Sequence, residues 1–150
     1  MKNKLVINFF LTIVCTVNIA LASINNVVDN PEKVYLFAYS INDGKSGLNL
    51  AWSIDKENWH EIGPNHCFLF SDYGSWGSQK RMYDPYLYKD KAGLWHCIWS
   101  LNNDVNVFAH ASSKNLYEWK RQSYPQVMEN NNFQEPEVHY DVSNNNYVIS

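Results

Sequence analysis

Two carboxylates beside prolines are the residues of this sequence best suited to catalysis. Asp84 precedes Pro85 and Glu137 follows Pro136, and each lies shortly before a run of strand-forming residues. Proline fixes its own φ and biases the residue before it toward extended backbone, which predicts an Asp84 side chain aimed into a cleft. Hydrolysis of a glycosidic bond requires such carboxylates, because one activates water or attacks carbon and another protonates the leaving oxygen.

Asp84 is therefore the candidate catalytic residue, and Glu137 is the candidate substrate contact. Lys80 and Arg81 are expected to help keep Asp84 ionised, as a base must be near neutral pH. Glu135 is expected to be an ordinary surface charge. The alternative is that Asp84 and Glu137 are turn residues, since acids next to proline are common in turns.

Strands must position these carboxylates, because helical periodicity is almost absent after residue 23. Short runs rich in aromatic and β-branched residues predict strands, and segments rich in Gly and Asn separate them. The predicted strands are 34–40, 48–53, 94–100, 105–111 and 147–150. The predicted fold class is therefore all-β, with consecutive antiparallel strands.

Two segments recur at one offset, which indicates a structural repeat. VYLFAYS at 34–40 matches LWHCIWS at 94–100, and AWSIDKENW at 51–59 matches ASSKNLYEW at 111–119, both 60 residues apart. We expect 34–40 and 94–100 to be inner strands of successive sheets, and Trp59 and Trp119 to pack against the neighbouring sheet. Such sheets bury both faces only by stacking side by side, which predicts a β-propeller. A β-sandwich with accidental internal similarity is the alternative.

A propeller needs at least about four blades, and residues 23–150 hold about two and a half. This segment is therefore expected to be the incomplete N-terminal part of a longer domain. Residues 1–22 have the layout of a secretory signal peptide, with two lysines, a short apolar run and small residues ending at Ala22. We predict a secreted or periplasmic protein that is free of the membrane after cleavage. An uncleaved membrane anchor is the alternative.

The net charge of the chain bears on the kind of partner that it binds. The formal net charge is −3 and becomes more negative once Lys2 and Lys4 are removed, and no basic run exceeds a pair. This balance argues against a nucleic-acid partner. An aromatic content of 15% favours neutral sugars instead, whose rings stack on aromatic faces while carboxylates bind their hydroxyls.

The cysteines and histidines give no metal signature. Cys67 and Cys97 fit no zinc spacing, and the sequence leaves open whether they pair. No metal ligand is therefore predicted. Three histidines at strand positions are expected to be hydrogen-bonded in the core or between blades: His96, His110 and His139.

The stretch MYDPYLYKDKAGLWHCIWS, followed by VFAHASSKNLYEW, PQVMENNN and FQEPEVHYD, resembles the N-terminal half of a five-bladed propeller of glycoside hydrolase family 43. The resemblance covers about residues 33–150. It implies a glycosidase that hydrolyses O-glycosidic bonds in arabinose- and xylose-containing polysaccharides or oligosaccharides, with inversion and without an organic cofactor. A structural calcium near the propeller axis is compatible with it, although the sequence shows no ligand signature.

Carried over residue by residue, Asp84 matches the family's catalytic general base and Glu137 a residue that lines the central funnel. The general acid and the pKa-modulating Asp of the family are expected beyond Ser150. The sequence departs from the family motifs at Tyr83, where Arg is common, and at Gln134-Glu135, where the family has Trp-Ala.

Two other functions remain open. These departures are compatible with a non-catalytic carbohydrate-binding propeller. S-x-D-x-x-x-W at 53–59 approaches the Asp-box of sialidase propellers, but it is one residue short and lacks the glycine. Sialidases also need an arginine triad, and the segment offers only Arg81 and Arg121.

Overall fold

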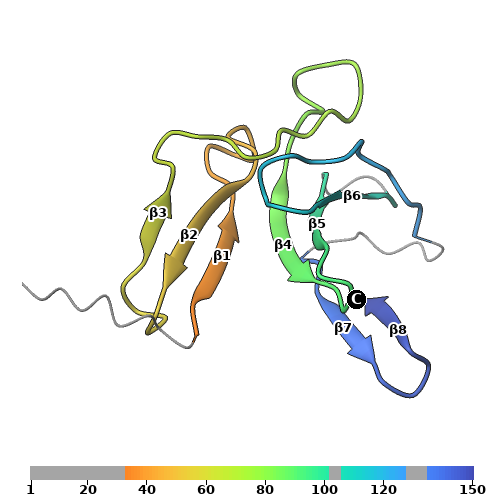
Figure 1. Cartoon of the computed structure of the whole chain (residues 1–150). Coiled ribbons are helices and arrows are strands. Elements are labelled where there is room, and N and C mark those ends of the chain that lie inside the picture. The colour runs from red at the N-terminus through yellow and green to blue at the C-terminus, as the bar shows by residue number, and fades with distance from the viewer. Residues whose placement is uncertain (1–32, 102–105, 128–134) are drawn as a thin grey trace, which may run out of the picture. The chain divides into compact units, whose positions relative to one another are not determined.

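The computed structural model describes residues 33–101, 106–127 and 135–150, so the predicted signal peptide at 1–22 lies outside the described residues. The described residues form eight strands and no helix (Figure 1). The strands are β1 (Tyr35–Tyr39), β2 (Asn49–Ser53), β3 (His60–Ile62), β4 (Tyr83–Lys89), β5 (Trp95–Ser100), β6 (Phe108–Ser113), β7 (Val138–Asp141) and β8 (Asn146–Ile149). The all-β class is thus confirmed. This part of the chain accordingly has no helix long and apolar enough to cross a membrane.

The strands form three antiparallel sheets of neighbours in sequence: β1-β2-β3, β4-β5-β6 and the hairpin β7-β8. Strands β1, β2 and β5 lie within the predicted runs, and β6 and β8 overlap theirs with bounds shifted by one or more residues. None of the predicted runs covers β3, β4 or β7. Two of these are short, and β4 carries a proline and an acid that usually interrupt strands.

The assignment of 94–100 as an inner strand is wrong, because β5 lies in the middle of its sheet, between β4 and β6. Asp84 therefore lies within a strand rather than ahead of one. The pairing of β4 with β5 shifts register between Tyr83 and Tyr86, which is a bulge. β4 is an edge strand of its sheet, and a bulge at an edge is where a strand tolerates Pro85, which has no N–H to donate.

One hydrophobic cluster connects the first two sheets. Its fully or almost fully buried members, here called the core cluster, are Leu48, Leu50, Leu69, Met82, Cys97, Trp99, Leu101, Ala109 and Ala111. Leu36 and Ala38 of β1 and Leu87 of β4 pack against it from the side. Cys97 and Cys67 are both unpaired, and complete burial raises the pKa of the Cys97 thiol far above its usual value.

The repeated turn is confirmed in atomic detail. In the first copy the Asp55 Oδ1 atom accepts the backbone N–H groups of Glu57 and Asn58, both at 2.8 Å. In the second copy the Asn115 Oδ1 atom accepts those of Tyr117 at 3.1 Å and Glu118 at 2.8 Å. The residue after each acceptor has a left-handed backbone, with φ 67° at position 56 and 65° at position 116. The two turns therefore share one geometry.

The two tryptophans that follow these turns do not share one environment. Trp119 packs against the core cluster, and its packing against the next sheet stays a prediction. Trp59 is 41% exposed and contacts Phe37, with ring centroids 5.3 Å apart. The two rings lie on corresponding faces, since Phe37 is at the repeat position of Cys97, but that face is covered only in the second sheet: Phe37 is 50% exposed, whereas Cys97 is fully buried.

Gly47 is required where the loop after β1 meets the segment around Leu69. Its φ is +67°, and a Cβ atom there would lie 2.5 Å from the Leu69 carbonyl oxygen and 2.6 Å from the Cys67 sulfur. We expect Gly47→Ala to lower the free energy of unfolding by at least about 1–2 kcal/mol, the cost of left-handed backbone alone. Urea denaturation measures the change. Gly77→Ala is the control, since no atom lies within 4 Å of its added Cβ, and equal effects of the two substitutions would contradict the steric argument.

Candidate functional site

Asp84 lies at the bulged start of β4 with its side chain exposed. Its φ is 47°, so the expectation of an extended backbone before proline is wrong. The register shift between Tyr83 and Tyr86 supplies the reason, because a bulge residue leaves the strand conformation and turns its side chain out of the alternation. Asp is among the few non-glycine residues that adopt this left-handed region readily.

Glu135 is the structural counterpart of Asp84. It also precedes a proline, Pro136, and its φ of 49° is nearly the same. The hairpins that follow the two acids correspond in register: Tyr86 pairs with Ile98 in one. Glu137 and Ser150 exchange backbone hydrogen bonds of 3.0 and 3.1 Å in the other.

Glu137 therefore corresponds to Tyr86, and the equivalence expected between Asp84 and Glu137 is wrong. The informative signal was an acid directly before proline, which occurs as Asp84-Pro85 and Glu135-Pro136. The correspondence predicted from the sequence pairs Asp84-Pro85 with Pro136-Glu137, which leaves Glu135 as a surface charge.

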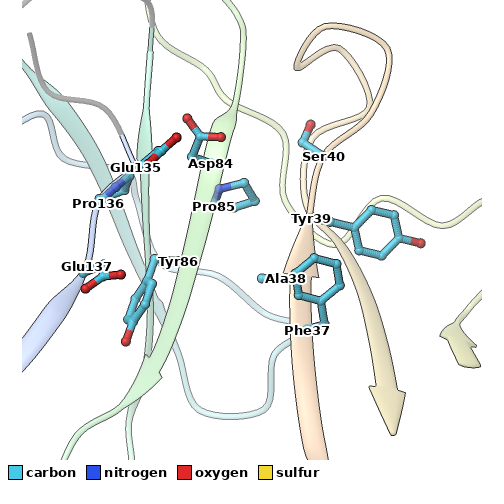
Figure 2. A pocket seen from close by; sticks show the side chains of 10 residues that line it. All are labelled: Phe37, Ala38, Tyr39, Ser40, Asp84, Pro85, Tyr86, Glu135, Pro136 and Glu137. Atoms are coloured by element: carbon cyan, nitrogen blue, oxygen red, sulfur yellow. The ribbon is translucent and has the colours of Figure 1, made fainter. Parts of the chain in front are cut away.

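Asp84 and Glu137, the two site residues predicted from the sequence, line one cavity of about 350 Å³ together with Glu135. Figure 2 shows the carboxylates of Asp84 and Glu135 on the same side of this cavity, with Glu137 further along the chain toward β7. The lining residues are Phe37, Ala38, Tyr39, Ser40, Asp84, Pro85, Tyr86, Glu135, Pro136 and Glu137. Three acids and no Lys or Arg belong to this set, so the described part of the cavity is electronegative.

Strand β1 supplies the wall opposite the carboxylates. β1 contacts β4, and its side chains alternate between the two faces of the sheet. Ala38 points toward β4, whereas the Tyr39 ring is directed away from it (Figure 2). Burial, and next the nearby Glu61 carboxylate, raise the pKa of Tyr39. Its hydroxyl therefore stays protonated and able to donate.

Arg81 does not support Asp84 in the way that was expected. Its Nε atom lies 3.9 Å from the Asp43 carboxylate, and its Nη1 atom donates to the Gly77 carbonyl at 3.1 Å. Tyr83 also donates to Asp43, at 3.1 Å, and burial followed by this contact raises the Tyr83 pKa. The side chains of Arg81 and Tyr83, just before Asp84, therefore both contact Asp43.

The histidines divide into two kinds. His96 and His110 are hydrogen-bonded between strands, as predicted. His139 is not in the core: its side chain is 65% exposed and its Nε2 atom lies 3.3 Å from a Glu137 oxygen. It lies on the face of β7–β8 that no described strand covers. Among the described residues, no group of three His, Cys, Asp or Glu side chains is placed to hold a metal ion.

The arrangement joins two acids from equivalent hairpins at one open cavity. Such carboxylates can hydrogen-bond sugar hydroxyls, and an ionised one within reach of water can act as a general base. No protein-family model matches the chain, and no curated protein or solved structure matches it significantly. The geometry of the site therefore carries the functional argument.

Proposed function

We propose that this chain is part of an exported five-bladed β-propeller of the glycoside hydrolase family 43 type, which hydrolyses glycosidic bonds in arabinose- or xylose-containing glycans. Three successive antiparallel sheets support this proposal. The repeated turns at Asp55 and Asn115, and the corresponding hairpins that follow Asp84 and Glu135, support it further. Repeats of this kind are typical of propeller blades.

The cavity is the observation that carries the catalytic part of the proposal. Asp84 lies at its edge, exposed to solvent, on a backbone that the bulge and Pro85 hold in place. In this position it would remove a proton from the attacking water. Glu137 lines the same cavity and would bind substrate hydroxyls. A hydrolysis assay with aryl arabinofuranosides and aryl xylosides tests the activity directly.

One observation favours a second candidate, a propeller that binds carbohydrate without hydrolysing it. Glu135 lines the cavity where the family motif has a small neutral residue, and it brings a second carboxylate beside Asp84. A second carboxylate adds hydrogen-bond acceptors for sugar hydroxyls, which binding alone requires. Binding of oligosaccharides without turnover in the assay would favour this candidate.

The electronegative lining predicts discrimination by ligand charge. We expect Glu135→Gln to tighten binding of a glucuronate-bearing xylo-oligosaccharide by about three- to tenfold, since one like charge a few ångströms away costs about 1 kcal/mol in water. Binding of the neutral oligosaccharide should change little. Isothermal titration calorimetry compares the two ligands.

Glu57→Gln is the matched control, because Glu57 is exposed on a turn and does not line the cavity. Its affinity for both ligands should equal that of the unmodified chain. Equal gains for the charged and neutral ligands with Glu135→Gln would show that the charge of Glu135 does not face the ligand.

A further inference from the structure

A chain of four polar side chains crosses the second sheet on the face opposite the core cluster. His96 Nε2 lies 3.1 Å from the Asp90 carboxylate, and His96 Nδ1 lies 2.9 Å from His110 Nε2. His110 Nδ1 lies 3.3 Å from the Ser123 hydroxyl. The histidines belong to the neighbouring strands β5 and β6, and Ser123 follows β6. One continuous row therefore links the β4–β5 turn to the segment that pairs with β6.

The direction of the hydrogen bonds follows from the ionised acid. Hydrogen bonds from the Leu94 N–H and from His96 hold the pKa of Asp90 below its usual range, so its carboxylate only accepts. His96 Nε2 must then carry a proton. With both histidines neutral, His96 Nδ1 accepts from His110 Nε2–H, and His110 Nδ1 accepts from the Ser123 hydroxyl. Every ring nitrogen has a partner in this state.

The row can accept one added proton but not two. If His96 is protonated on both nitrogens, its Nδ1–H donates to His110 Nε2, and neutral His110 donates from Nδ1 to the Ser123 oxygen. If both histidines are protonated, two N–H groups face each other across 2.9 Å. That contact is repulsive, and the bond between β5 and β6 side chains is lost.

Tyr88 and Lys91, which lie next to this row, contact the third sheet. The Tyr88 ring of β4 stacks on His96 at 4.8 Å and meets the Tyr147 ring of β8 at 5.4 Å. The Lys91 backbone N–H donates to the Tyr147 hydroxyl at 3.0 Å, and its ammonium group lies 3.8 Å from the centre of the Tyr140 ring.

The titratable and charged groups near the two histidines come from the elements that lie around them. The β4–β5 turn supplies Asp90 and Lys91, β4 supplies Tyr88, and β8 supplies Tyr147. Asp90 is the only acid among them, so it compensates a single added charge.

We propose that the row Asp90–His96–His110–Ser123 is a proton-sensitive latch that stays closed with one added proton and opens with the second. Tyr88, which stacks on His96, also meets Tyr147 of the hairpin β7–β8, so the row adjoins the contact between the second and third sheets. Acidification therefore loosens the second sheet beside this contact.

The sign of the pH dependence follows from the proton count. Burial and the proximity of His96 lower the pKa of His110 in the folded chain. Below about pH 6.5 the unfolded chain binds a proton at both histidines, whereas the folded chain binds at most one. The unfolded state then holds more protons, so stability is greatest above this pH and falls as the pH decreases.

Urea unfolding of the whole chain between pH 8 and pH 5 tests the latch. The unfolding equilibrium constant should rise by up to about tenfold for each pH unit below about 6, the dependence produced by one excess proton. His110→Gln should remove this excess, because the Gln amide donates to His96 Nδ1 from the same region and does not titrate. His60→Gln, an exposed histidine of β3, should keep the unmodified pH dependence.

If the His110→Gln chain fails to fold, a second measurement on the unmodified chain tests the proposal. Nitrogen-15 NMR of the imidazole rings in the unmodified chain should show His110 neutral at a pH where His96 is charged. Independent titration of both rings near pH 6.5 would overturn the proposal. An unfolding constant that His110→Gln leaves equally pH-dependent would overturn it as well.

Discussion

Asp84→Asn is expected to lower kcat on aryl arabinofuranosides or aryl xylosides by about 10²–10⁴, the usual contribution of a positioned general base. Asn keeps the shape of the side chain and loses its ability to take a proton from water. It also tolerates left-handed backbone, so the φ of 47° should impose no new strain. The melting temperature and the affinity for a neutral oligosaccharide should therefore stay close to those of the unmodified protein.

The assay is to be made on a protein with a complete propeller, because the proposed hydrolysis also needs an acid that protonates the leaving oxygen. Glu57→Gln serves as the control for loss of one exposed carboxylate, and its kcat should be unchanged. Unchanged turnover in Asp84→Asn would rule out the base role. If the unmodified protein binds oligosaccharide but does not turn over any of these substrates, the carbohydrate-binding candidate is the better description.

Trp99→Ala should lower the free energy of unfolding by about 3–5 kcal/mol, as large-to-small changes of buried aromatics do. Trp99 is fully buried and belongs to the core cluster. The loss combines the removed apolar area with a cavity that the surrounding side chains fill only in part. Domains of this size are stable by only about 5–15 kcal/mol, so the variant should be largely unfolded at moderate urea concentration.

Trp76→Ala is the matched comparison, since Trp76 is 73% exposed. Its unfolding midpoint in urea should move little, because surface substitutions usually change stability by less than about 0.5 kcal/mol. Similar losses for the two variants would mean that the core cluster is not the centre of stability.

Interactions between residues close in sequence made the turns and five of the strands predictable. The frame that places Ser53 and Asp55 before Trp59 specifies its own hydrogen bonds, since acceptor and donors lie within a few residues. Alternation of aromatic and β-branched residues likewise marks a strand through its neighbours in sequence. These features need no knowledge of the rest of the fold.

The order of strands within a sheet was not predictable in the same way. β5 pairs with β4, whose sequence YDPYLYK contains a proline and charged residues, and the strand exists because a bulge removes the proline from the ladder. The site was affected by the same bulge. Asp84 was found from its residue type, whereas the match of Glu135 to Asp84 rests on the acid directly before proline and is shown by the left-handed backbone that the two acids share.

The two turns after β2 and β6 also bear on how a duplicated segment can diverge. Asp55 and Asn115 make corresponding bonds to backbone N–H groups, although one side chain is charged and the other is neutral. One side-chain oxygen atom therefore suffices to hold the backbone of this turn, whether or not the side chain carries a charge. Copies of the unit can carry different surface potentials without any change in the path of the chain.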